Sequence, residues 1–231
     1  MSTPPPLDAA HWNILGLVLV AEIAAQYSSS LVVMALPQIQ VALAIPDDQI
    51  GNLGGTLRLG MVLTLFVTAM ADRLGRRRLL LASVALLCLS TAASGLSRNA
   101  SDFLLFQLVA RIAMGAVFTL GAVVIAEEFT ARDRGWGIGA LAMLGAVGYA
   151  GGMGLYAAVD WMPAGWRILH FIGLAPLFVL PLLAQRMPET QRFRRRADAR
   201  EADAETLLQS CLLYTSPSPR DLSTSRMPSS A

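Results

Sequence analysis

Polar side chains stand at helical spacing inside the first long apolar run of this sequence. Glu22 lies in the middle of the run, and Gln26, Ser29 and Ser30 follow it at i+4, i+7 and i+8. That spacing places all four on one face of a helix. In a membrane, an ionisable group costs about 2.5–3.5 kcal/mol on insertion scales and needs a partner or a water-filled cavity. The stripe is therefore predicted to line a central cavity, with Glu22 as a candidate proton site. A fixed hydrogen-bond or ion-pair network around Glu22 is the alternative.

Two arginines occupy other apolar runs, where a charge has a similar cost. Arg58 lies in the second run, where it would bind an anionic substrate, pair with Glu22 or line an aqueous vestibule; the sequence leaves these options open. Arg111 lies one turn beyond Gln107 in the fourth run. A long side chain that only extends to the outer interface is the alternative for Arg111. The predicted substrate or proton pathway comprises Glu22, Gln26, Ser30, Arg58, Gln107 and Arg111.

The composition indicates that these runs cross a membrane. Of the 231 residues, 55% are hydrophobic and only 15% are charged, whereas roughly 25% are charged in a soluble domain. A helix needs about 20 apolar residues to span a bilayer. Six runs approach that length, so the predicted fold is an all-α membrane protein with six transmembrane helices. The predicted helices cover residues 12–36, 50–71, 79–97, 103–126, 137–159 and 166–186.

The distribution of arginine predicts the orientation of these helices, because cytoplasmic loops carry an excess of basic residues. Only Arg98 and Arg167 lie near helix ends on one side. We expect both ends of the six-helix unit in the cytoplasm, in a bacterial-type inner membrane. Residues 1–11 would form an N-terminal tail and residues 187–210 the start of a cytoplasmic linker. The arginines on the cytoplasmic side are Arg73, Arg76, Arg77, Arg78, Arg132, Arg134, Arg186, Arg192, Arg194, Arg195, Arg196 and Arg200.

The composition changes abruptly after Ser210. Residues 211–231 are rich in Ser and Pro and lack a helical period. They resemble translated sequencing-adapter sequence, so we expect an artefact that follows a truncated reading frame. A disordered, low-complexity tail is the alternative.

Short motifs occur in order along the apolar runs. Residues 71–78 read A-D-R-L-G-R-R-R between the second and third runs, and residues 111–115 form an R-x-x-x-G pattern in the fourth. An E-E…R-G pattern covers residues 127–135, a W-R pair opens the sixth run at 166–167, and P-E-T-Q-R follows it at 188–192. Together, over residues 12–196, these motifs resemble the major facilitator superfamily.

The resemblance implies a twelve-helix transporter built from two six-helix bundles, of which this chain is the amino-terminal half, with substrate bound between them. It implies that Asp72 helps to latch the two halves together on the cytoplasmic side and that Arg111 acts in gating or proton coupling. The sequence departs from the family pattern at Thr68, where glycine is usual. The signature loop and its charge network would comprise Asp72, Arg73, Gly75, Arg76, Arg77, Glu127, Glu128 and Arg134.

The predicted function is proton-coupled uptake of a small polar or anionic organic solute, a sugar or an organic acid, by alternating access. Drug or metabolite efflux by proton antiport is the alternative. It is less favoured because Val147 and Gly148 stand where drug antiporters have Gly and Pro in a G-P-x-x-G-G pattern. A membrane-embedded enzyme or sensor is less favoured still, because the sequence offers no catalytic constellation. The expected partners are the bilayer, a small-molecule substrate, protons and a second six-helix half; no cofactor, metal or nucleic acid is expected.

Overall fold

The computed structural model describes residues 9–186 and Thr206. The predictions for the N-terminal tail before residue 9, for the linker at 187–210 apart from Thr206, and for the tail at 211–231 lie outside the described residues. Within the described part all regular secondary structure is helical. The elements are α1 (Ala9–Ala42), α2 (Asp47–Ala69), α3 (Ala71–Leu74), α4 (Arg76–Ser94), α5 (Ala100–Glu128), α6 (Arg134–Tyr156), the 3₁₀ helix η1 (Val159–Trp161), α7 (Trp166–Ile172) and α8 (Ala175–Arg186).

Five of these helices, α1, α2, α4, α5 and α6, are long and apolar enough to cross a membrane. The first one extends beyond its predicted end, because α1 continues through Pro37 to Ala42. The extension is held by packing: Ile39 of α1 is fully buried in a cluster with Leu53 and Leu57 of α2. Tertiary contacts here outweigh the tendency of proline to end a helix.

The sixth predicted span, residues 166–186, is one apolar run in sequence but two helices in the structure. The break falls at Gly173, the C-cap residue that follows α7, and α8 begins two residues later. Leu174 N–H donates to the Phe171 carbonyl over 3.0 Å in a tight turn between the helices. Pro176 follows in the first turn of α8, where its missing N–H costs no helical hydrogen bond. The sixth predicted span is therefore an apolar segment that a tight turn divides into two consecutive helices.

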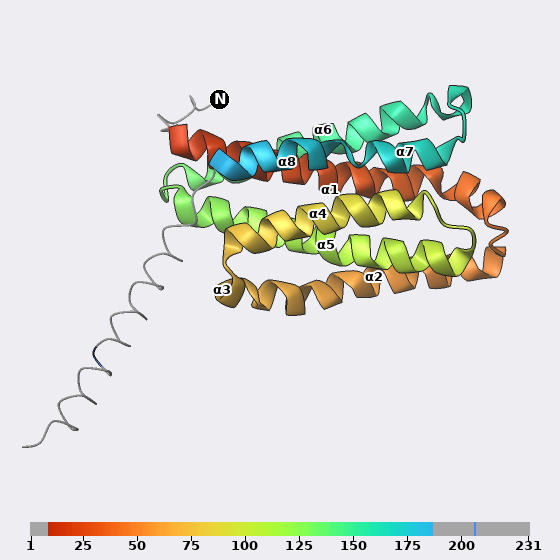
Figure 1. Ribbon diagram of the computed structural model, residues 1–231, viewed down its shortest axis with the longest axis horizontal. Coiled ribbons are helices and arrows are strands. Elements are labelled where there is room, and N and C mark those ends of the chain that lie inside the picture. Colours follow the sequence, from red (N-terminus) through yellow and green to blue (C-terminus); the bar gives the residue numbers. More distant parts are fainter. Residues whose placement is uncertain (1–8, 187–205, 207–231) are drawn as a thin grey trace, which may run out of the picture. The chain divides into compact units, whose positions relative to one another are not determined.

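Helix α1 lies inside the bundle and packs against α6, α5 and α8, while α4 packs against α5 and α7. Figure 1 shows α2 and α6 at opposite edges of this arrangement, with α1, α4 and α5 between them. The most apolar window is 50–56% buried in α1, α4 and α5 but 22% buried in α2 and α6. Large apolar side chains therefore remain exposed along the two edge helices, among them Leu59, Val62 and Phe66 of α2 and Met143 of α6.

The glycines of α6 let this helix lie against the α1 backbone. A Cβ on Gly148 would stand 2.8 Å from Ile23 Cα, and one on Gly145 would stand 3.1 Å from Glu22 Oε1. Other glycines of the same helix, Gly139 and Gly151, have nothing within 4 Å of an added Cβ. The glycines of α6 thus allow a close contact with α1 on one face and leave another face of the helix open.

Candidate transport pathway and charge cluster

A partly buried carboxyl–amide pair lies midway along α1. Gln26 Nε2 donates to Glu22 Oε1 over 3.1 Å, as expected for side chains one helical turn apart. The Glu22 side chain is 2% exposed. Its second oxygen, Oε2, has no hydrogen-bond partner among the described residues. Because Gly145 of α6 has no side chain, the carboxyl fits between the two helices.

Arg111 approaches the same side of α1 from α5. Its Nη1 donates to Ser29 Oγ over 3.4 Å and lies 3.8 Å from Met114 Sδ. Gly60 of α2 leaves room for the side chain, since a Cβ there would stand 2.9 Å from Arg111 Cβ. Ser29 lies one turn beyond Gln26 on the α1 stripe. The structure therefore brings Glu22, Gln26, Ser29 and Arg111 to neighbouring positions on one face of α1.

Three other residues predicted for the pathway have different surroundings. Ser30 is fully buried and donates to the Tyr27 carbonyl over 2.7 Å. Gln107 is 1% exposed and donates to Ser94 Oγ of α4 over 3.0 Å. Arg58 is exposed on α2, and it forms no ion pair with Glu22. These three do not join the group around Arg111.

Sequence reasoning missed several polar residues that tie the helices together. The Ser28 and Thr91 hydroxyls are 2.8 Å apart and join α1 to α4. Thr64 of α2 donates to the Ile112 carbonyl of α5 over 3.1 Å and fills the notch above Gly115. The spacing of Ser83, Ser90, Thr91 and Ser94, all buried on α4, was a sequence signal for a polar helix face.

The signature loop, residues 71–78, lies at an end of the bundle that carries charged side chains. Gly75 adopts φ 90° and ψ 135° between α3 and α4, a region where a side chain is strained. Immediately after it, Arg76 forms an ion pair with Glu127 at the end of α5, and these side chains are only 14% and 7% exposed. Each charge is unfavourable for the dipole of its own helix, a cation at an N-terminus and an anion at a C-terminus. Their pairing offsets both effects.

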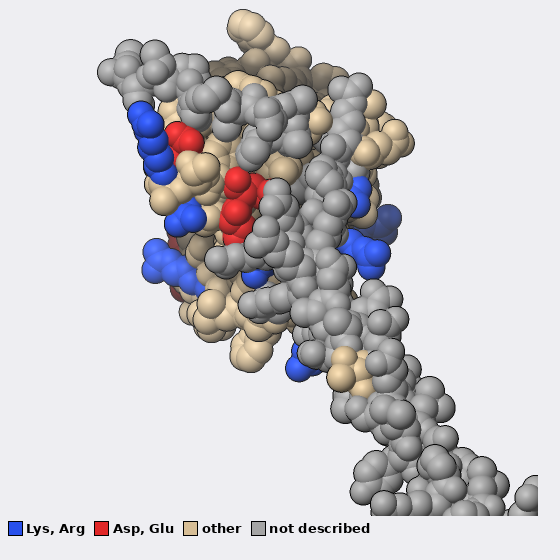
Figure 2. All heavy atoms as spheres, turned by 90° about the vertical axis from the view of Figure 1, so that its left-hand side faces the viewer, with Lys and Arg blue, Asp and Glu red and all other residues tan. Residues whose placement is uncertain are grey.

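The other predicted members of this cluster are placed differently. Arg77 and Glu128 are half-buried, whereas Arg73 and Arg134 are exposed. The Asp72 side chain lies outside the described part of the structure. Arginine and acidic side chains gather on the end of the bundle that Figure 2 presents. Among the described residues, no group of three or more His, Cys, Asp or Glu side chains could hold a metal ion.

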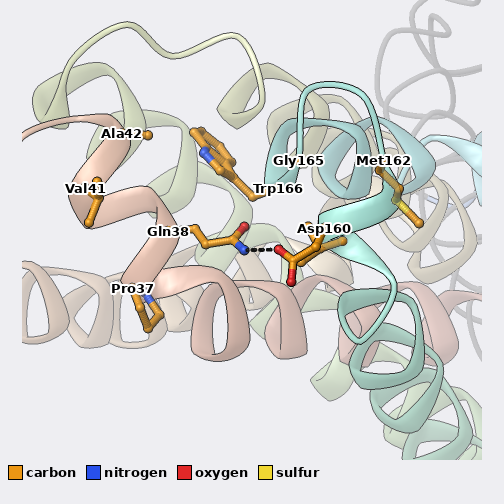
Figure 3. A pocket seen from close by; sticks show the side chains of 9 residues that line it. Pro37, Gln38, Val41, Ala42, Asp160, Met162, Gly165 and Trp166 are labelled. Carbon is orange, nitrogen blue, oxygen red and sulfur yellow. Dashed lines mark hydrogen bonds between the residues drawn. The ribbon is translucent and has the colours of Figure 1, made fainter.

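A pocket lies at the opposite end of the bundle, where α1 meets η1 and α7 (Figure 3). It has a volume of about 590 Å³. Gln38 Nε2 donates to Asp160 Oδ1 over 3.5 Å on its wall. Beside it, Arg167 donates to the carbonyls of Gly95 and Ser97 over 2.7 and 2.8 Å, and so caps the end of α4. The lining residues are Pro37, Gln38, Val41, Ala42, Val159, Asp160, Met162, Gly165 and Trp166.

Comparisons with known proteins agree with this helical architecture. The chain is 24% identical to the inner membrane metabolite transport protein YgcS of Escherichia coli over 205 residues, which cover 88% of the chain and 46% of that protein. It is 27% identical to a gallate transporter of Pseudomonas putida, with 87% of the chain and 44% of that protein covered. The chain thus spans about half the length of these relatives.

A solved structure of the xylose transporter XylE from E. coli, in a partially occluded inward-open conformation, has the same fold. The TM-score is 0.73 at 16% identity, and the match covers 88% of the chain and 56% of XylE. The family model described as Major Facilitator Superfamily matches residues 18–222. The chain therefore belongs to the Major Facilitator Superfamily.

Proposed function

We propose that this chain is one six-helix half of a twelve-helix transporter that takes up small organic anions together with protons. The two curated relatives support this proposal, since one is named a metabolite transport protein and the other a gallate transporter. Gallate is a carboxylate that carries hydroxyl groups. An organic acid of this kind would need a cation and several hydrogen-bonding groups within the membrane, and residues of α1 and α5 offer both.

The observation that carries the proposal is the position of Arg111. A guanidinium has five N–H donors. The contacts of Arg111 within the described residues are a long hydrogen bond to Ser29 and a thioether, with no carboxylate among them. A substrate carboxylate would satisfy the remaining donors in the two-point geometry that Arg favours. Ser29 and Gln26 would then bind substrate hydroxyl groups from α1.

Glu22 is proposed to carry the coupled proton. A bare carboxylate oxygen sealed from water is costly unless it is paired or protonated, and Glu22 Oε2 has no partner among the described residues. Proton binding would remove this cost when the site is closed, and access to water would allow release. Because Gln26 contacts Glu22 and lies one turn from Ser29, substrate binding at Arg111 would influence the carboxyl through α1.

The cytoplasmic charge cluster is proposed to act as the latch between conformations. Charged groups at a moving interface pair in one state and are hydrated in the other, which gives two stable arrangements. The pair formed by Arg76 and Glu127 fixes the loop on the first bundle. Asp72, Arg73 and Arg134 would contact the second bundle when the cytoplasmic side closes. This arrangement requires both ends of the six-helix unit in the cytoplasm.

Transport by the complete protein in membrane vesicles tests the role of Glu22. We expect Glu22→Gln to abolish uptake driven by a proton gradient while exchange of substrate across the membrane continues. Asp160→Asn makes the same acid-to-amide change in η1, outside the α1 stripe, and should leave both activities unchanged. Driven uptake that survives in Glu22→Gln would refute proton coupling through this residue.

Arg111 and the direction of transport need separate measurements. Arg111→Lys keeps the positive charge but cannot donate two parallel hydrogen bonds to one carboxylate. We therefore expect a higher KM for a hydroxybenzoate and little change in the rate of substrate exchange at saturating concentration. Uptake in right-side-out vesicles would support import. Accumulation only in inverted vesicles would instead establish efflux, the alternative that the sequence left open.

A further inference from the structure

An apolar groove runs along the side of the bundle between α1, α6 and the broken sixth span. It has a volume of about 340 Å³. Two of the helices that line it, α1 and α6, are long and apolar enough to cross a membrane, and the core of a bilayer consists of acyl chains. The lining residues are Ile23, Ala24, Tyr27, Val147, Gly148, Gly151, Leu155, Ile172, Ala175 and Pro176.

The groove exists because the sixth span is interrupted and because α6 has glycine where it faces the groove. Ile172 ends α7, and Ala175 and Pro176 begin α8, so the turn between them forms one wall. Gly151 opens the facing wall, since nothing lies within 4 Å of a Cβ built on it. Tyr27, the one ionisable residue of the lining, donates its hydroxyl to the Leu169 carbonyl over 2.8 Å. The groove therefore offers no free charge to a polar ligand.

The groove is separate from the proposed transport pathway. Successive residues turn by about 100° around a helix, so Ile23 and Tyr27 lie on a different side of α1 from Gln26 and Ser29. Helix α6 packs on α1 between these two sides, through the close approach of Gly148 to Ile23. A ligand in the groove would not reach Arg111.

The rim of the groove continues into an apolar outer surface. Val147 of α6 is 55% exposed, and Phe178 and Val179 of α8 are 81% and 44% exposed. Exposed apolar side chains on membrane-spanning helices contact acyl chains wherever no other helix covers them. The groove is thus a recess in an exposed apolar surface, and its walls have the same apolar chemistry as that surface.

We propose that one acyl chain of a bilayer lipid occupies this groove and fills the space left by the break in the sixth span. The lipid would pack against α1, α6 and α8 together and would hold the divided span on the bundle. This proposal depends on membership of the family and not on the transported solute. It does not require Glu22 or Arg111 to act in transport.

Photolabelling with a lipid tests the proposal. The complete transporter is placed in vesicles of phosphatidylethanolamine and phosphatidylglycerol that contain phosphatidylethanolamine with a diazirine midway along one acyl chain. Labelled peptides are then quantified by mass spectrometry. We expect the lining residues of α6 and α8 to be labelled severalfold more than the exposed surface of α4 around Leu86 and Leu89.

Two glycine variants of α6 provide a matched comparison. Gly151→Leu would fill the groove, whereas Gly139→Leu adds the same side chain about 120° around the helix, also where nothing lies within 4 Å. We expect Gly151→Leu to reduce labelling of the lining to the level of α4 and Gly139→Leu to leave it unchanged. Ala175→Leu fills the groove from α8 and repeats the test if Gly151→Leu does not fold.

Two results would overturn the proposal. The first is labelling of the lining no stronger than that of α4 in the unaltered protein. The second is equal labelling in the groove-filling and control variants. Disulfide-linked dimers formed through Val147→Cys, together with an unlabelled lining, would show that a second copy of the chain occupies the groove and would equally reject the lipid.

Discussion

The contact between α1 and α6 supports the most specific prediction, because it depends on one missing side chain. A methyl group on Gly148 would meet the backbone of Ile23, with Cα at 2.8 Å and the carbonyl carbon at 3.0 Å. A backbone cannot rotate away as a side chain can, so Gly148→Ala must push the two helices apart. Gly151→Ala makes the same chemical change one turn along α6, where nothing lies within 4 Å.

Comparing Gly148→Ala with Gly151→Ala gives the expected loss in the free energy of unfolding. Overpacking a well-packed interior costs about 1–3 kcal/mol. Replacing glycine by alanine inside a helix gains up to about 1 kcal/mol from propensity, and this gain is common to both variants. We therefore expect Gly148→Ala to be less stable than Gly151→Ala by about 1–3 kcal/mol.

Equilibrium unfolding in mixed detergent micelles, followed by tryptophan fluorescence, measures this difference. Trp12 and Trp136 report on the same pair of helices, since their rings meet edge to face with centroids 6.3 Å apart. A difference within about 0.5 kcal/mol, the range of neutral surface substitutions, would show that α1 and α6 do not pack at Gly148 and would refute the reasoning.

Three further predictions concern other close contacts. Gly75→Ala should lower the free energy of unfolding by about 1–3 kcal/mol, because φ is 90° there; a melting curve like that of the unaltered protein would contradict this. Gly115→Ala should lower the free energy of unfolding, because its methyl group would clash with Thr64. Adding Thr64→Ala should recover part of that loss, with a coupling of about 0.5–3 kcal/mol in a double-mutant cycle. Strictly additive losses would contradict the contact. Arg76→Glu and Glu127→Arg should each lower the melting temperature, whereas the double reversal should restore it, because it pairs the charges again and matches both helix dipoles. If the melting temperature of the double variant falls by the sum of the two single losses, this pairing is excluded.

The length of the apolar runs was enough to predict the helical fold, because a bilayer-spanning helix satisfies its own backbone hydrogen bonds. Local breaks were harder to predict. The predicted first helix ended at residue 36, but packing of Ile39 carries α1 on to Ala42. Conversely, Gly173 divides the run over 166–186, and a glycine followed by Pro176 three residues later is a helix-end signal that the predicted span passed over. Such boundaries depend on contacts between distant segments.

The spacing of polar residues predicted neighbours on one helix better than contacts between helices. Gln26 follows Glu22 at i+4, and the two side chains are hydrogen-bonded. Ser30 shares the spacing, but its hydroxyl bonds to the backbone of its own helix, which is common for serine. Gln107 and Arg111 are one turn apart on α5 and yet reach α4 and α1 respectively. The sequence does not show which helix lies beside each of them.

Thiol labelling tests most directly the claim that the α1 stripe and Arg111 share a water-filled route. Ser29→Cys is introduced into the complete transporter with its other cysteines replaced, and reaction with a membrane-impermeant reagent is measured with and without substrate. Ser90→Cys, buried on α4, is the control. We predict that the cysteine at position 29 reacts readily and that substrate slows the reaction. If it is as unreactive as the cysteine at position 90, or if substrate has no effect, the proposed pathway is contradicted.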